Sequence, residues 1–388
     1  MSRKINSRPL ASLARAGLAI VFSLFLFACS GGGEKLPPVN IDLSQSGPYL
    51  PGITTVTLHD TSRTTMANGT YPGDASRTLV VDIRYPSTTG GNNAPLDLSG
   101  GPYPLIVLSH GYMAQGRIYS YFTNHLASYG YVTAAPDFPL TNLAAPGGAN
   151  PADVLNQPGD VSFVMDRMLD FSAAPGNLLA GSIDPDRIGV AGHSLGGFTT
   201  LLVSFSPVYG DDRIKASMPM APFGCPFEKD FFRTHSVPLL LAGGTADIFV
   251  TFQENLAAPY KLAVSPKYLL EVTDGTHMSF CDMNIPEYQA FITMFSSATF
   301  TDVMAGQMKD LLNSVGSADQ CAGMGVMSDP SSIKAPGKVI EPDHQRRLVK
   351  IYGTAFFEIY LKGKEEYKYF FTEDFTKTTP EAVIHKDN

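Results

Sequence analysis

The chain has 388 residues, of which 44% are hydrophobic, and a formal net charge of −8. This much apolar sequence can supply the core of one large domain or of two. The acidic balance and the absence of a basic stripe argue against a nucleic-acid partner, because neutralising phosphates needs clustered Lys and Arg. No spacing of Cys and His resembles a zinc site, so we expect no bound metal.

The first 28 residues are typical of a targeting segment. Basic residues precede the apolar run 16–28, which is too short to span a bilayer as a stable helix. The run ends in Leu26-Phe27-Ala28-Cys29, which resembles a bacterial lipobox. The resemblance implies an exported protein, lipidated at Cys29 and anchored to the cell envelope, with Ser30 favouring the outer membrane. The alternative is an ordinary secretory signal followed by an unrelated cysteine.

Residues 29–50 contain Gly- and Pro-rich stretches that predict a flexible tether, and residues 51–388 form the predicted domain. In that domain, apolar runs alternate with helical patterns. The first two runs indicate an antiparallel pair and the later ones buried strands: 53–58, 78–85, 105–108, 131–135, 187–191, 216–221, 238–242 and 268–272. Helices are expected at 118–128, 160–171 and 348–361. The alternation predicts an α/β fold with a mostly parallel sheet that helices cover on both faces.

One stretch does not follow this alternation. Residues 283–342 combine a Phe- and Met-rich helical pattern with a loop rich in Gly, Ser and Pro. We interpret this stretch as an inserted helical cap over the site. The alternative is a helix that only thickens the core.

Gly192-His193-Ser194-Leu195-Gly196 is the most informative motif in the chain. A predicted strand precedes this Gly-x-Ser-x-Gly sequence and a helical pattern follows it, which is the context of a nucleophile elbow. The glycines suit the turn because a sharp strand-to-helix junction crowds the neighbours of the serine. Ser194 is therefore the candidate nucleophile, presented at a helix N-terminus.

A serine nucleophile needs a base, and the base needs an orienting acid. His277 is the one histidine after Ser194 that follows a predicted strand in a loop of small residues. Asp247 follows the preceding predicted strand in a tight turn, and it either orients His277 or merely caps the next helix. Surface positions are expected for the other histidines outside the motifs: His59, His125, His235, His344 and His385.

An oxyanion hole needs two backbone donors. The N–H of Leu195 should be one, because it follows the nucleophile, and the loop after the strand 105–108 should supply the other. We assign that second donor to the N–H of Tyr112, with Gly111 letting the loop turn inward. His110 and His193 are expected to be buried structural partners and not the base.

Three cysteines remain beyond the lipobox: Cys225, Cys281 and Cys321. An exported protein can hold a disulfide, and one bridge among three cysteines allows three pairings that sequence cannot distinguish. We favour Cys281–Cys321, because these residues flank the greater part of the insertion.

These residues and their order are similar to the α/β-hydrolase superfamily. Further stretches carry the resemblance: 81–86, 104–111 and 184–194. Within the superfamily the chain resembles dienelactone-hydrolase-like proteins and plasma-type platelet-activating-factor acetylhydrolases with their bacterial lipoprotein relatives. Dienelactone hydrolases use a cysteine nucleophile, whereas this chain has Ser194. The insertion 283–342 is also longer than simple members of the branch need.

The motifs predict a serine hydrolase that cleaves carboxylic esters, small or polymeric, through an acyl-enzyme and without a cofactor. Two narrower substrates remain open, namely a phospholipid resembling platelet-activating factor and a polyester or phthalate ester. A third alternative is a surface binding lipoprotein that keeps the fold without catalysis. The chain-length preference and the oligomeric state are left open.

Overall fold

A ten-stranded sheet organises the part of the chain that the computed structural model describes, which is residues 36–282, 307, 309–316, 321 and 337–387. The strand order is β10-β9-β8-β7-β6-β4-β5-β2-β1-β3. Strands β4 to β9 run parallel, while β1, β2 and β10 pair antiparallel with a neighbour. The bounds are β1 Leu50–Asp60, β2 Arg77–Ser87, β3 Gly91–Asn92, β4 Tyr103–Ser109, β5 Val132–Asp137, β6 Ile183–His193, β7 Ile214–Met220, β8 Leu239–Gly244, β9 Lys267–Val272 and β10 Ala382–Asp387.

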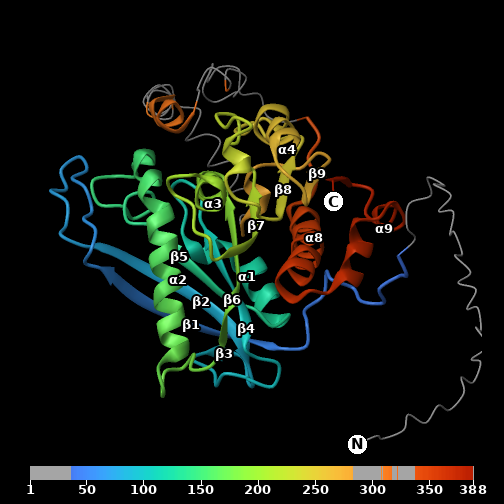
Figure 1. Cartoon of the computed structure of the whole chain (residues 1–388), viewed down its shortest axis with the longest axis horizontal. Coiled ribbons are helices and arrows are strands. Elements are labelled where there is room, and N and C mark those ends of the chain that lie inside the picture. Colours follow the sequence, from blue (N-terminus) through green and yellow to red (C-terminus); the bar gives the residue numbers. More distant parts are fainter. Residues whose placement is uncertain (1–35, 283–306, 308, 317–320, 322–336, 388) are drawn as a thin grey trace, which may run out of the picture. The chain divides into compact units, whose positions relative to one another are not determined.

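Helices pack on both faces of this sheet, as Figure 1 shows. One hydrophobic cluster joins the sheet to α2 and α3, and a second joins its other face to α1 and α8. The α-helices are α1 Ser120–Ser128, α2 Gln157–Ala173, α3 Leu195–Phe205, α4 Ala258–Leu262, α8 Pro342–Lys362 and α9 Glu373–Thr376. Short 3-10 helices are η1 Gly116–Tyr119, η2 Pro151–Asn156, η3 Phe231–Arg233, η5 Met278–Phe280 and η8 Glu365–Phe371, and η4 Gln253–Ala257 is a π-helical turn.

Strand β4 illustrates why the central strands are apolar throughout. Leu105 and Val107 belong to the cluster under α2 and α3, whereas Ile106 and Leu108 belong to the cluster under α1 and α8. Because successive side chains of a strand point to opposite faces, burial of both faces removes the polar alternation. This confirms the α/β fold with a mostly parallel sheet covered on both faces that the apolar runs predict.

Each predicted run coincides with an observed strand, with one residue outside it at 131, 221 and 238, and the first two runs form the expected antiparallel pair. The sequence did not reveal β10, which pairs with β9 at one edge of the sheet. The strand has the sequence AVIHKD, whose three apolar residues are too short a run to predict a strand, and only Ala382 is buried.

The predicted tether ends earlier than expected. Residues 1–35 lie outside the described residues, so the signal peptide and lipidation of Cys29 stay predictions, which mass spectrometry of the exported protein would test. From Leu43 onward the chain packs against the end of α1: Leu43 is buried, and the Tyr49 N–H donates to the Ser128 carbonyl at 3.0 Å. The folded part therefore begins before residue 51. No helix among the described residues is long and apolar enough to cross a membrane.

The predicted cap at 283–342 falls mainly outside the described residues, so its role as a cap is not decided. Within the described part, residues 309–315 are helical. Leu311 and Leu312 are buried in the cluster that includes α2 and α3. This short piece therefore contributes to the core.

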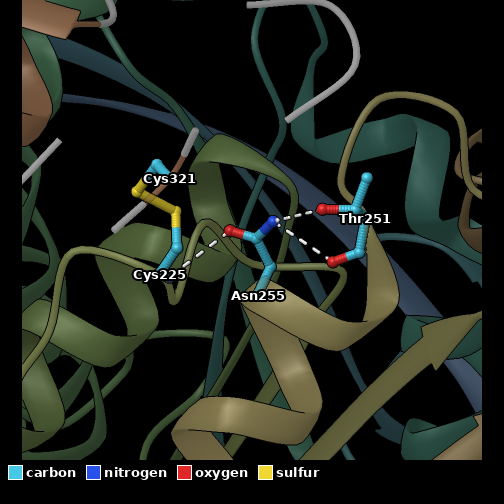
Figure 2. The surroundings of a disulfide bond; sticks show 4 residues. All are labelled: Cys225, Thr251, Asn255 and Cys321. Carbon is cyan, nitrogen blue, oxygen red and sulfur yellow. Dashed lines mark hydrogen bonds between the residues drawn. A yellow bond between two sulfur atoms is a disulfide. The ribbon is translucent and has the colours of Figure 1, made fainter. Parts of the chain in front are cut away.

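The predicted disulfide Cys281–Cys321 is wrong. Cys321 bonds to Cys225, with Cα atoms 5.2 Å apart (Figure 2). Cys281 is buried in the other hydrophobic cluster, and its thiol donates to the Met278 carbonyl at 2.9 Å. The pairing follows from the two faces of the sheet, because Cys225 and Cys321 share one cluster and Cys281 lies in the other.

Candidate active site

Ser194 occupies a strained turn between β6 and α3. Its φ of 57° and ψ of −119° lie in a region that non-glycine residues rarely adopt. A Cβ at Gly192 would collide with the Gly196 carbonyl, and a Cβ at Gly196 would collide with the Ser109 carbonyl. The two glycines therefore let strand, turn and helix pack closely enough to hold the serine in this conformation.

The loops after β8 and β9 bring Asp247 and His277 together. Asp247 Oδ2 lies 2.7 Å from His277 Nδ1, and both side chains are buried. The other carboxylate oxygen, Oδ1, accepts the N–H groups of Phe249 and Val250 at 2.9 and 2.8 Å. With Oδ1 occupied in this way, Oδ2 accepts a hydrogen bond from the Nδ1–H of His277, which leaves Nε2 as the proton acceptor.

Backbone hydrogen bonds lock these two loops to each other. The Thr245 N–H donates to the Val272 carbonyl at 3.0 Å, and the Ala246 N–H donates to the Gly275 carbonyl at 2.9 Å. A Cβ at Gly244 would collide with Gly275, so the two loops can approach this closely only with glycine there. The carboxylate and the imidazole are thus held by the ends of neighbouring parallel strands.

The His277 ring lies between the elbow and the loop after β8. Its centroid is 4.6 Å from that of His193, the residue before Ser194, and 5.3 Å from that of Phe249. The Ser194 N–H donates to the Met220 carbonyl at the end of β7, which ties the elbow to the same edge of the sheet. The structure therefore brings together the three residues predicted as nucleophile, base and acid.

The two predicted oxyanion donors are also available. Gly111, in the loop after β4, lies against the nucleophile, because a Cβ built on it would be 3.3 Å from the Ser194 Cβ. Among the described residues, the N–H groups of Tyr112 and Leu195 have no hydrogen-bond acceptor. The loop is fixed by its neighbours, since the Tyr112 hydroxyl donates to the Ala149 carbonyl at 2.8 Å and the Met113 N–H donates to the Thr141 carbonyl at 2.8 Å.

His110 and His193 are buried structural residues, as expected. His110 Nδ1 donates to the Gly111 carbonyl at 2.7 Å, and its Nε2 accepts the Phe138 N–H at 3.0 Å. Burial lowers the pKa of His110 to about 4 and that of His193 well below its ordinary value. Both are therefore neutral near pH 7. The surface prediction for His125 is wrong, since this residue too is buried and its ring packs at a tilt against that of Tyr129.

Sequence reasoning missed Tyr119. Its buried hydroxyl accepts the Gly111 N–H at 3.0 Å and donates to His193 Nδ1 at 3.0 Å. One side chain thus connects the loop of the oxyanion donors to the elbow. A tyrosine at the start of a predicted helix carries no sequence signal for this role.

The arrangement supplies a serine at a strained turn, a histidine with a free acceptor nitrogen, a carboxylate behind it and two N–H donors. This set can transfer an acyl group. The described residues hold no group of three or more His, Cys, Asp or Glu side chains placed to bind a metal ion.

Comparison with known proteins identifies the family of this chain. The model of the PET hydrolase-like family matches residues 75–296, more than half of the chain. The chain belongs to the PET hydrolase-like family. The resemblance to the α/β-hydrolase superfamily is thereby confirmed, whereas the acetylhydrolase branch within it stays a prediction.

Over the aligned stretches, two curated relatives are about a quarter identical to this chain. Cutinase est1 of Thermobifida alba is 26% identical over 194 residues, which cover 49% of this chain and 58% of that protein. Bis(hydroxyethyl) terephthalate hydrolase of Streptomyces coelicolor is 26% identical over 188 residues, covering 48% and 54%. The chain thus spans just over half the length of these two relatives.

Among solved structures, a ferulic acid esterase from Streptomyces cinnamoneus superposes with a TM-score of 0.58 at 22% identity. The match covers 87% of this chain and 97% of that protein. At this identity the likeness establishes the α/β-hydrolase fold.

Proposed function

We propose that this protein of the PET hydrolase-like family is a carboxylic ester hydrolase with Ser194, His277 and Asp247 as its catalytic triad. The observation that carries the proposal is the buried 2.7 Å pair of His277 and Asp247 at the same sheet edge as the strained Ser194. A surface histidine and a helix-capping carboxylate would not need to meet in the interior beside an elbow.

In the proposed reaction, His277 Nε2 removes the Ser194 hydroxyl proton while Oγ attacks the ester carbonyl carbon. The N–H groups of Tyr112 and Leu195 stabilise the tetrahedral oxyanion. His277 returns the proton to the leaving alcohol, which departs and leaves an acyl-enzyme. Water, deprotonated by His277, then releases the acid and restores Ser194. Asp247 keeps the Nδ1 proton in place and stabilises the imidazolium in both steps.

The substrate class we favour is an ester of an aromatic acid, including polyesters. Support comes from the matched family, described as PET hydrolase-like, and from the relative named for bis(hydroxyethyl) terephthalate. Two alternatives remain to be tested against this substrate class. The protein could instead be a phospholipid acetylhydrolase, or a lipoprotein that binds ligands without catalysis.

The decisive test compares the folded wild type with Ser194→Ala on p-nitrophenyl esters from acetate to palmitate and on bis(hydroxyethyl) terephthalate. We expect the wild type to turn over the terephthalate and the short esters. The variant should lose about 10⁴-fold or more in kcat, because the nucleophile is absent. Ser204→Ala is the matched control: it lies on α3 with its hydroxyl 2.8 Å from Ser217 Oγ, and its turnover should stay near that of the wild type.

Circular dichroism and labelling by a fluorophosphonate complete the test. Turnover by purified Ser194→Ala, or a folded wild type that neither hydrolyses any ester nor reacts with the probe, contradicts the proposal. Turnover of acetylated phospholipids in preference to terephthalates would overturn the substrate class alone.

A further inference from the structure

The loop that carries His277 is short and has little regular structure of its own. It begins after β9 and includes the single 3-10 turn η5. Asp274 has a φ of 56°, and the Gly275 N–H donates to the Val272 carbonyl at 3.1 Å, so the chain turns sharply just before the histidine. The position of the imidazole therefore depends on what holds the backbone of Thr276, the residue before it.

The backbone of Thr276 is held by one side chain from α8. The Thr276 N–H donates to Gln345 Oε1 at 2.9 Å, and Gln345 Nε2 donates to the Thr276 carbonyl at 2.9 Å. Both partners are buried, and Gln345 has no exposed surface. One backbone group is a donor and the other an acceptor, and the side-chain amide of Gln345 satisfies both because it carries an acceptor and a donor.

The loop and the amide are packed without spare room. A Cβ at Gly275 would lie 3.0 Å from Gln345 Oε1 and 2.9 Å from the Val272 Cβ. The same stretch of chain holds the loop at two further points. The Ile340 N–H donates to the Asp274 carbonyl, and Arg346 Nη1 donates to the Cys281 carbonyl, both at 2.9 Å.

From this geometry we infer that Gln345 is a positioning residue for His277. It contacts no reacting atom, and it acts by fixing the peptide that precedes the base. Its amide holds the loop from the α8 side, while Asp247 holds the imidazole from the β8 side. The inference rests on the proposed function, since it needs His277 to be the base.

Small errors in placement of a catalytic group are costly, because a shift of about 1 Å can reduce a rate about 100-fold. Gln345→Met keeps the length and most of the volume but removes both hydrogen bonds. We expect kcat for p-nitrophenyl acetate to fall about 10- to 100-fold with little change in KM, because substrate binding does not use the amide.

Gln345→Glu gives a second, reversible readout. An ionised carboxylate accepts the Thr276 N–H but repels the Thr276 carbonyl, whereas a protonated carboxyl has one acceptor and one donor and so imitates the amide. A buried carboxyl takes up its proton at a higher pH than an exposed one. The ratio of the variant's kcat to that of the wild type should therefore rise as the pH is lowered from 8 to 5.

Tyr352→Phe is the matched control for a purely structural loss. It also lies on α8, and it removes a buried 2.7 Å hydrogen bond to Thr379, away from the loop. We expect it to lower the thermal midpoint while leaving kcat unchanged at temperatures where the protein is folded.

The outcomes separate the two proposals. If Gln345→Met and Gln345→Glu both keep the wild-type kcat, or lose no more than Tyr352→Phe at every pH, Gln345 is structural only and the inference is overturned. If Gln345→Met does not fold, the pH-dependent ratio of Gln345→Glu still decides. Retention of activity by Ser194→Ala in the same assay would instead overturn the proposed function.

Discussion

At the scale of single residues, the Tyr119 hydroxyl joins the oxyanion loop to the nucleophile elbow, two parts of the site whose relative position the proposed reaction depends on. It accepts the Gly111 N–H next to Tyr112, and it donates to His193 next to Ser194. This one buried oxygen therefore fixes the distance between the segment of the nucleophile and the segment of one oxyanion donor. Burial also raises the pKa of Tyr119 well above its ordinary value, so the hydroxyl keeps its proton across the working range.

Tyr119→Phe removes this oxygen and leaves the ring. We expect kcat/KM to fall about tenfold, which corresponds to ~1.4 kcal/mol and lies within what the loss of its two hydrogen bonds can cost. Tyr85→Phe is the control, because it loses a buried 2.9 Å hydrogen bond to Ala94 that is remote from the elbow. Equal rates for Tyr119→Phe and the control would contradict the role of Tyr119 in aligning the site.

At the scale of elements, the disulfide joins the segment after β7 to a residue in the region 283–342. Figure 2 shows that the Cys225 side of the bridge is itself attached to η4. The Cys225 N–H donates to Asn255 Oδ1 at 3.3 Å, and Asn255 Nδ2 donates to the Thr251 carbonyl at 3.2 Å. The bridge therefore connects Cys321 to η4, the element that follows the Asp247 loop.

Removing this bridge should destabilise the protein. The bonded residues are 96 apart in sequence, and for a loop of that length the chain-entropy relation gives about 4–5 kcal/mol as an upper estimate. We expect the Cys225→Ala/Cys321→Ala protein to melt at a lower temperature than the wild type. Differential scanning fluorimetry with and without dithiothreitol checks this.

The reductant supplies the internal control. It should lower the midpoint of the wild type and of Cys281→Ala, and it should leave the double variant unchanged. A wild-type midpoint that is insensitive to full reduction, verified by thiol titration, would falsify the stabilising role of the bridge.

At the scale of the whole molecule, buried histidines connect stability to pH. Burial lowers the pKa of His110 to about 4 and that of His125 to about 3. In the unfolded chain a histidine takes up a proton below about pH 6.5. Between these values the unfolded state binds protons that the folded state does not bind. These groups therefore lower the free energy of unfolding as the pH falls from about 6.5 toward 4.

His125 allows this contribution to be measured away from the active site. His125→Gln keeps a hydrogen-bonding side chain but cannot titrate. We expect its thermal midpoint to fall less than that of the wild type when the pH is lowered from 7 to 5. Parallel curves for the two proteins would show that His125 does not contribute to the loss.

The sequence by itself determined the fold class and the three residues of the candidate triad. Each of Ser194, Asp247 and His277 follows a short apolar strand in a turn of small residues, and both properties are local. Parallel strands bring their carboxyl ends to one edge of the sheet, so the topology of the sheet by itself places residues at those ends near one another. The glycines of the elbow were predictable for the same reason, since the turn requires them in any such fold.

Only the tertiary structure decided which distant groups support the triad. Gln345 is 69 residues from Thr276, Tyr119 is 74 from His193, and Cys225 is 96 from Cys321. Each of these pairs forms because a helix or loop packs at a particular place on one face of the sheet. A single glutamine, tyrosine or cysteine has no periodicity or motif that would record this packing.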